Sequence, residues 1–121
     1  NHLLGGGDAV LTVSQNSPVI TGAVAVGDGL SFELSFGVGS SQTLTPTALI
    51  ATVTLPRAYA TIPRCMVSAS ATGWPTNGVS FSATAISTSE IEVHYQGANV
   101  ITAGGSPITG LQVTVAVFGK T

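Results

Sequence analysis

The sequence predicts an all-β fold: a single antiparallel β-sandwich, jelly-roll-like, with about eight strands. Apolar residues alternate with small or polar ones along several segments, and turn residues separate these segments. No window of a dozen residues keeps the 3.6-residue apolar period of a helix. Thr and Val are abundant, whereas Lys, Arg and Glu are scarce. The 121 residues have room for one hydrophobic core.

The start of the chain is expected to be a linker. Residues 1–8 lack an initiator Met, contain a run of three glycines and resemble no signal peptide, so they are interpreted as a linker from a longer chain. The β-sandwich domain is then expected to span residues 9–121. Its first strands are predicted at 9–14 and 18–26, and the Gly-Asp-Gly sequence at 27–29 predicts a tight hairpin after them.

The middle of the chain holds the clearest strand pattern. Residues 30–38 alternate without interruption, so that one face is wholly apolar and the other is small or polar. A flexible stretch is predicted from 39 to 43, where Gly, Ser and Gln gather. Weaker alternation predicts further strands at 48–55 and 64–71.

The last third of the chain repeats the same design. A loop is predicted at 73–78, followed by a strand at 78–86. Residues 90–95 alternate clearly, and residues 99–110 are expected to form the longest late connection. The final strand is predicted at 111–118. The inward-facing residues of the 90–95 strand are predicted to be Ile91, Val93 and Tyr95.

The charge content excludes several classes of function. Charged residues make up 7% of the chain, against about 25% in an average soluble domain. Lys and Arg total 3 and the net charge is -2, so no basic patch is available for nucleic acid or an anionic membrane. The apolar runs are shorter than the roughly 20 residues needed to cross a bilayer, so no membrane insertion is expected.

Low charge is also typical of protomers that bury surface against one another. The segments expected to be apolar on both faces in such an oligomer are residues 50–55 and the pair Ala116 and Phe118. The single cysteine, Cys65, cannot form an internal disulfide and is expected to be a buried free thiol.

Titratable residues are too few and too scattered to predict catalysis. His94, Glu92 and a serine resemble a triad only in composition, and the sequence contains no Gly-x-Ser-x-Gly motif. A pair of carboxylates built from Glu33 with Glu90 or Glu92 would need a cleft, whereas these residues occupy strand positions expected to face solvent. We therefore expect no catalytic residue, no cofactor and no enzymatic activity.

Glu90, Glu92 and His94 are predicted to share one face of a strand. Side chains two residues apart on a strand lie about 6.5–7 Å apart, which is too far for one metal ion to bind all three. Two of them could bind an ion together with a partner chain, or the set is simply the solvated face of an outer strand. No metal site is predicted for the isolated chain.

The loop around the only tryptophan is the candidate ligand-binding region. An exposed Trp74 can stack on the apolar face of a sugar, or it can cover one end of the core or contact a neighbouring subunit. Polar residues of this loop and of the 99–110 connection are expected to supply hydrogen bonds. The candidate ligand-binding residues are Trp74, Thr76, Asn77 and Asn99.

The central segments resemble a known type of module. Residues 51–55 (Ala-Thr-Val-Thr-Leu) lead into 58–64 (Ala-Tyr-Ala-Thr-Ile-Pro-Arg), and the apolar strand 65–69 follows. This order resembles a recurrent β-sandwich module of bacteriophage and prophage virion structural proteins, and residues 78–81, the strand ending at Tyr95 and residues 115–119 are similar to its closing strands. The likeness spans roughly residues 18–119. No binding residue is carried over, because Glu33, Glu92 and His94 have no counterpart in the module.

The resemblance implies a virion-surface domain at a fibre tip, tail tip or head decoration, commonly a homotrimer and assembled in the host bacterial cytoplasm. Its implied partners are copies of itself, other virion proteins joined through a preceding part of the chain, and a bacterial surface glycan or protein. The resulting hypothesis is a non-enzymatic domain that attaches a phage to the bacterial surface through glycan. The alternatives are a structural virion or connector module without a ligand, and a carbohydrate-binding module of a secreted bacterial protein.

Overall fold

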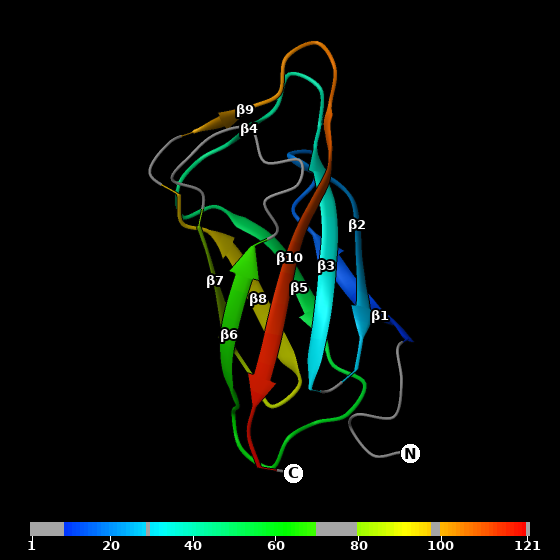
Figure 1. Cartoon of the computed structure of the whole chain (residues 1–121), viewed down its shortest axis with the longest axis vertical. Helices are drawn as coiled ribbons and strands as arrows, with labels where there is room; N and C mark the ends of the chain where they lie inside the picture. Colours follow the sequence, from blue (N-terminus) through cyan, green and yellow to red (C-terminus); the bar gives the residue numbers. More distant parts are fainter. Residues whose placement is uncertain (1–8, 29, 70–79, 98–99, 121) are drawn as a thin grey trace.

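A computed structural model describes residues 9–28, 30–69, 80–97 and 100–120. Within these residues it contains ten strands and no helix, so the expected all-β fold is confirmed (Figure 1). The strands are β1 Ala9–Gln15, β2 Ile20–Gly27, β3 Ser31–Val38, β4 Thr43–Leu44, β5 Leu49–Thr54, β6 Arg64–Ala69, β7 Phe81–Ala85, β8 Glu90–Tyr95, β9 Ile101–Thr102 and β10 Ile108–Phe118.

Eight of these strands form one sheet in the order β6-β10-β3-β2-β1-β5-β8-β7, and every neighbouring pair is antiparallel. The sheet curls until its two edge strands, β6 and β7, lie side by side, which makes the molecule nearly barrel-shaped (Figure 1). Strands β4 and β9 form a separate two-stranded ribbon at one end of the barrel. The expected sandwich of two stacked sheets is not confirmed, because one sheet runs through all eight strands.

Strand β1 joins the two halves of this sheet. Its residues 9–11 pair with β2, and its residues 12–15 pair with β5 on the other side. The strand therefore changes partner at its midpoint. This switch links the half formed by β6, β10, β3 and β2 to the half formed by β5, β8 and β7.

The inside of the barrel is filled by apolar side chains from all the long strands. Alternation of buried and exposed positions is clearest in β8 and β10, as period-two patterning predicts. Phe81 contributes to an aromatic cluster, with ring centroids 6.4 Å from Phe36 and 5.7 Å from Tyr95. Each fully buried Val, Leu, Ile or Phe stabilises the fold by about 1.5–3 kcal/mol. The core contains Ile20, Leu34, Val38, Ile50, Val53, Ile91, Val93, Leu111, Val113 and Val115, among others.

Two β-bulges bend the sheet at the same level. The pairing of β2 with β3 shifts between Thr21 and Val24, and the pairing of β10 with β3 shifts between Ile108 and Leu111. The extra residues include Gly22 (φ 60°) and Gly110 (φ 76°), in the left-handed region that glycine adopts without steric cost. Both bulges lie opposite the end of β3, so its two neighbours bend together and the sheet curls there.

The structure corrects several expected boundaries. The connection expected at 99–110 contains β9 and the beginning of β10, because the bulge at Gly110 interrupts the alternation that would reveal this strand. Likewise, the flexible stretch expected at 39–43 ends inside β4. Leu30 was expected on the buried face, but it precedes β3 and is 48% exposed. Cys65 is a free thiol as expected, although it is half-buried rather than fully buried.

Candidate binding face

The outer face of β5, β8 and β7, together with the part of β1 that pairs with β5, is lined almost entirely by polar side chains. Inward-facing Ile91, Val93 and Tyr95 alternate with outward-facing residues of β8, as predicted. Pairing places Glu92 between Thr52 of β5 and Thr84 of β7, and His94 opposite Ser82. We call this surface the polar face. Its outward-facing residues are Thr12, Ser14, Thr52, Thr54, Ser82, Thr84, Glu90, Glu92 and His94.

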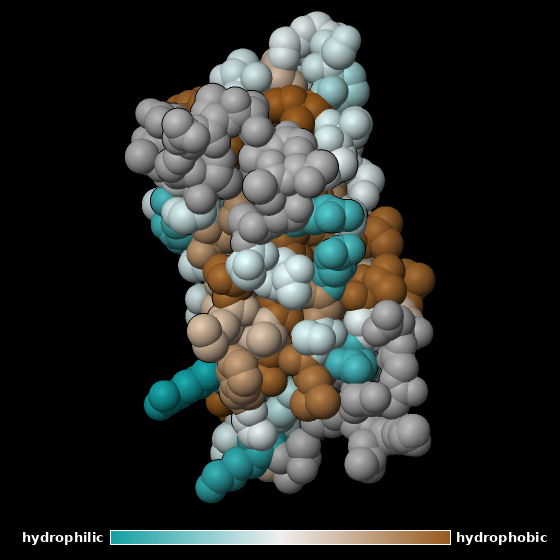
Figure 2. Space-filling model, in the orientation of Figure 1, coloured by the Kyte–Doolittle hydropathy of each residue, from teal (hydrophilic) through white to brown (hydrophobic). Residues whose placement is uncertain are grey.

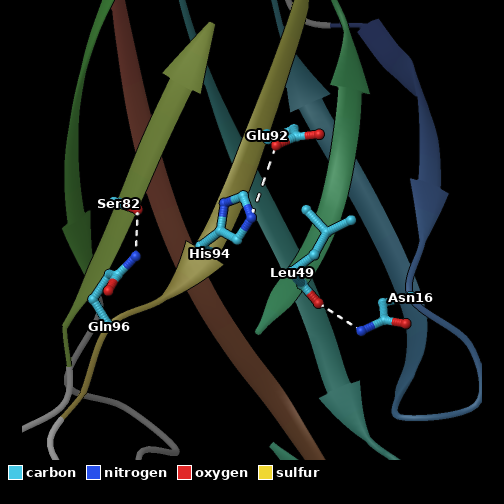
Figure 3. A network of polar contacts seen from close by, with 6 residues as sticks. All are labelled: Asn16, Leu49, Ser82, Glu92, His94 and Gln96. Atoms are coloured by element: carbon cyan, nitrogen blue, oxygen red, sulfur yellow. Dashed lines mark hydrogen bonds and ion pairs between the residues drawn. The ribbon is translucent and has the colours of Figure 1, made fainter. Parts of the chain in front are cut away.

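The closest pair of titratable groups on the polar face is Glu92 and His94. The His94 Nε2 atom lies 3.8 Å from the Glu92 Oε1 atom, and the two side chains lie along the same strand (Figure 3). His94 is 26% exposed and Glu92 is 31% exposed, so a ligand can reach both groups. The pair thus offers a hydrogen-bond acceptor and an imidazole at one point of the surface.

Gln96, just beyond the end of β8, extends the polar face towards β7. Its side-chain Nε2 donates a hydrogen bond of 3.1 Å to Ser82 Oγ (Figure 3). Its backbone N donates to the Ser80 carbonyl at 2.8 Å, and its own carbonyl accepts a bond of 3.0 Å from Ser80 Oγ. Three hydrogen bonds therefore fix the backbone and the amide of Gln96 while its side chain remains exposed.

Asn16 lies at the opposite edge of the polar face, just after β1. Its Nδ2 donates a hydrogen bond of 2.8 Å to the Leu49 carbonyl, and its backbone N donates to the Ile50 carbonyl at 3.0 Å (Figure 3). Both acceptors lie beside the β-bulge of β5, where the pairing with β8 shifts between Leu49 and Ala51. The end of β1 is thus attached to the part of β5 where the strand bends.

A second feature lies on the other side of the barrel. A surface hollow of about 280 Å³ is lined by Val26, Gly27, Ser31, Phe32, Glu33 and Thr114, and we call it the Glu33 hollow. It is formed by the consecutive strands β2 and β3 together with β10, which is distant from them in the sequence, so alternation alone did not reveal it. The only signal was that Glu33 is the sole charged residue of its strand.

The candidate residues from the sequence meet different outcomes. Trp74, Thr76, Asn77 and Asn99 lie outside the described residues. Glu33 and Glu92 are not brought together as a carboxylate pair, because β2, β1 and β5 separate their strands in the sheet. Among the described residues, no group of three or more His, Cys, Asp and Glu side chains is placed to hold a metal ion.

The polar face combines hydroxyl, carboxylate, amide and imidazole groups and contains no Lys or Arg. Such a mixture of donors and acceptors fits a neutral, hydroxyl-rich ligand better than an anion. Comparison with known protein families, curated proteins and solved structures gave no match. In the part of the chain that the structure describes, no helix is long and apolar enough to span a membrane.

Proposed function

We propose that the chain is a non-enzymatic virion-surface domain, a distal fibre-tip or head-decoration module that attaches a phage to bacterial surface glycan. The observation that carries the proposal is the polar face, where four neighbouring strands present hydroxyl and amide groups around the Glu92–His94 pair. We further propose that the curled sheet is a jelly-roll-like sandwich, in which β1 joins the two layers.

Glycan suits this face because a sugar presents several hydroxyl groups that both donate and accept hydrogen bonds. The Glu92 carboxylate accepts such bonds, the Gln96 amide does both, and Ser82 and Thr84 supply hydroxyls. Glu92 and Thr84 are direct neighbours across β8 and β7, and Ser82 is hydrogen-bonded to Gln96. A rigid array of this kind lowers the entropy lost when a ligand is ordered on the surface.

Adhesion of the purified domain tests the proposal. Fluorescently labelled protein is incubated with a panel of bacterial strains, and with purified lipopolysaccharide and peptidoglycan as immobilised probes. We expect saturable binding to at least one probe, and a loss of tenfold or more in affinity for Glu92→Gln and for Gln96→Ala. Binding that neither substitution weakens would contradict the assignment to the polar face.

Gln112→Ala is the matched control for Gln96→Ala. Gln112 lies on β10, paired with Ser35 of β3, and its side chain is half-buried. Because it lies outside the polar face, its truncation is expected to leave adhesion unchanged. A loss as large as that of Gln96→Ala would show that the effect comes from stability or from another surface.

A structural virion or connector module without a ligand is the second candidate. It is favoured by three valines on the outer surface of β1 and β2, which are exposed by 75% (Val10), 44% (Val24) and 39% (Val26). Val10 and Val26 are paired directly across the two strands, so they form a continuous apolar strip. A domain that adheres to no strain and to neither purified probe supports this candidate instead.

A further inference from the structure

The outer surface of β6, β10 and β3 carries two charged residues of opposite sign. The five strands β6, β10, β3, β2 and β1 contain only two charged residues, Glu33 and Arg64. Both side chains are exposed, and among the residues that the structure describes neither forms an ion pair. The two charges are therefore available to a partner.

The strand register places these charges symmetrically around Ala116. Arg64 is paired with Phe118, and Glu33 is paired with Thr114, while Ala116 lies between these two positions on β10. Relative to Ala116, Arg64 lies on the neighbouring strand β6, level with the residue two positions later on β10. Glu33 lies on the other neighbouring strand, β3, level with the residue two positions earlier on β10. The three neighbouring rows, from β6 through β10 to β3, are Arg64–Phe118, Met66–Ala116–Ser31 and Ser68–Thr114–Glu33.

From this arrangement we propose that a second copy of the chain docks face to face on this surface, related by a two-fold axis that passes between the two Ala116 residues. The axis lies parallel to the surface and perpendicular to the line from Arg64 to Glu33, so Arg64 of each copy faces Glu33 of the other. The contact between Arg64 and Glu33 is therefore made twice in each dimer. The small side chain of Ala116 at the axis allows the two sheets to approach.

Two large apolar side chains flank the proposed axis. Met66 is 66% exposed and Phe118 is 53% exposed, and both neighbour Ala116 on the outer surface. Apolar residues reach the molecular surface in the lower part of this view (Figure 2). Burial of Met and Phe side chains at the centre of a contact, with charges at its margin, is the usual composition of protein interfaces.

The Glu33 hollow provides a place for the incoming arginine. Its volume of about 280 Å³ accommodates a guanidinium group, and Ser31 and Thr114 line it beside the carboxylate. Arginine binds a carboxylate through two parallel hydrogen bonds, and the neighbouring hydroxyls can accept further N–H groups. The contact leaves the polar face uncovered, because that face belongs to β1, β5, β8 and β7.

The size of the surface sets the expected strength. Three strands about 4.8 Å apart and three rows about 7 Å apart measure roughly 15 by 20 Å. A standard interface buries about 800 Å² on each partner, and this surface is smaller than that. The dimer is therefore expected to be reversible, with a Kd between about 10 μM and 1 mM. Its formation must therefore be followed as a function of concentration.

Charge reversal tests the proposal by sedimentation equilibrium up to about 1 mM protein. We expect the wild-type chain to dimerise, and Glu33→Arg and Arg64→Glu each to weaken dimerisation at least tenfold, since each places like charges together twice. The double variant, E33R with R64E, should restore dimerisation to within about threefold of wild type. Unchanged thermal unfolding of the single variants verifies that both remain folded.

Mixing the two single variants gives a sharper result. One variant then carries arginine at both positions and the other carries glutamate at both, so a mixed pair satisfies both contacts and dimerisation should return. A ring of three copies cannot alternate the two variants completely, so the mixture would restore such a trimer only in part. Recovery of a dimer supports the two-fold arrangement, whereas the absence of recovery overturns it.

Val10→Thr is the control for the apolar part of the surface. Val10 lies on β1, is 75% exposed and does not line the Glu33 hollow, so its substitution should leave dimerisation unchanged, whereas Met66→Thr should weaken it severalfold. A wild-type chain that stays monomeric up to about 1 mM overturns the proposal. So does association that depends on Val10 and not on Met66, because the second copy would then occupy the exposed valines of β1 and β2.

Discussion

The thiol of Cys65 on β6 is hydrogen-bonded to the backbone of Ala85 on β7, so the two edge strands of the curled sheet are joined at this point. Burial raises the pKa of the Cys65 thiol, and the hydrogen bond from Ala85 opposes this rise only in part. The thiol therefore remains protonated at neutral pH, and it lies where β6 and β7 come side by side.

Cys65 is expected to react slowly in the folded protein. The thiolate is the reactive form, and both partial burial and the raised pKa reduce its population and its access. With a chromogenic disulfide reagent at pH 7, we expect a rate at least about tenfold lower than in guanidinium-unfolded protein. Equal rates in the folded and unfolded protein would show that the contact between β6 and β7 does not protect the thiol.

The stability of the fold is expected to fall at alkaline pH. Burial raises the pKa of the Tyr59 hydroxyl, with further contributions from the negative charge of Asp28 and from Cys65. A folded-state pKa above the unfolded value means that the contribution to stability is complete below the unfolded value and is lost as the pH rises through the folded one. The unfolded values are about 8.5 for Cys and about 10 for Tyr.

Urea unfolding between pH 7 and 11 measures this loss. The midpoint should be constant up to about pH 8 and should then decrease steadily. Tyr59→Phe removes one titrating group, so its midpoint should decrease less steeply between pH 9.5 and 11, even if the variant is less stable at neutral pH. Parallel curves for the two proteins would rule out Tyr59 as a source of the pH dependence.

Gly110 is expected to tolerate no ordinary side chain without cost. Its φ of 76° lies in the left-handed region, while a Cβ atom would meet no other atom within 4 Å, so the cost is conformational only. Gly110→Ala should lower the free energy of unfolding by about 1–2 kcal/mol. Gly110→Asn should lower it less, because Asn enters this region more readily.

The control for Gly110 is Gly105→Ala. A Cβ atom at Gly105 likewise meets nothing within 4 Å, but its φ lies outside the left-handed region. We expect a change within about 0.5 kcal/mol for this variant. A similar loss for both glycines would mean that the bulge conformation is not the cause.

Asn16→Ala is expected to destabilise the link between β1 and β5. The substitution removes the side-chain hydrogen bond to the Leu49 carbonyl, which is partly buried, and should cost about 1 kcal/mol. Gln15→Ala serves as comparison, because the bonds of Gln15 to Ser17 and Ala23 are exposed and water can replace them. Chemical denaturation of both variants checks this order, and a larger loss for Gln15→Ala would reverse it.

Alternation predicted those parts of the fold that are regular along their whole length. The strand at 90–95 was predicted with its observed bounds, because each of its residues follows the period of two. The start of β10 was missed, since the extra residue at Gly110 changes the phase of the pattern. The joining of all eight long strands into one sheet depends on β1 changing partner at its midpoint, which no local pattern records.

The candidate site was predictable to a similar extent. Glu92 and His94 were placed on one face because they are two residues apart on one strand. The pairing of Gln96 with Ser82 was not foreseen, since it depends on the register between β7 and β8. The Glu33 hollow was not predictable, because Thr114 of β10 meets β2 and β3 only in the folded chain.

The central position of β10 has a consequence for the order in which the protein is made. Val115 of β10 pairs with Phe32 of β3, 83 residues earlier, and β10 also provides the ladder partner of β6. Until β10 has left the ribosome, β6 lacks this ladder partner and β3 lacks one of its two neighbours. Contacts between such distant segments slow folding and leave strand edges open to other chains. Newly synthesised copies therefore depend on β10 to cover the open edges of β3 and β6.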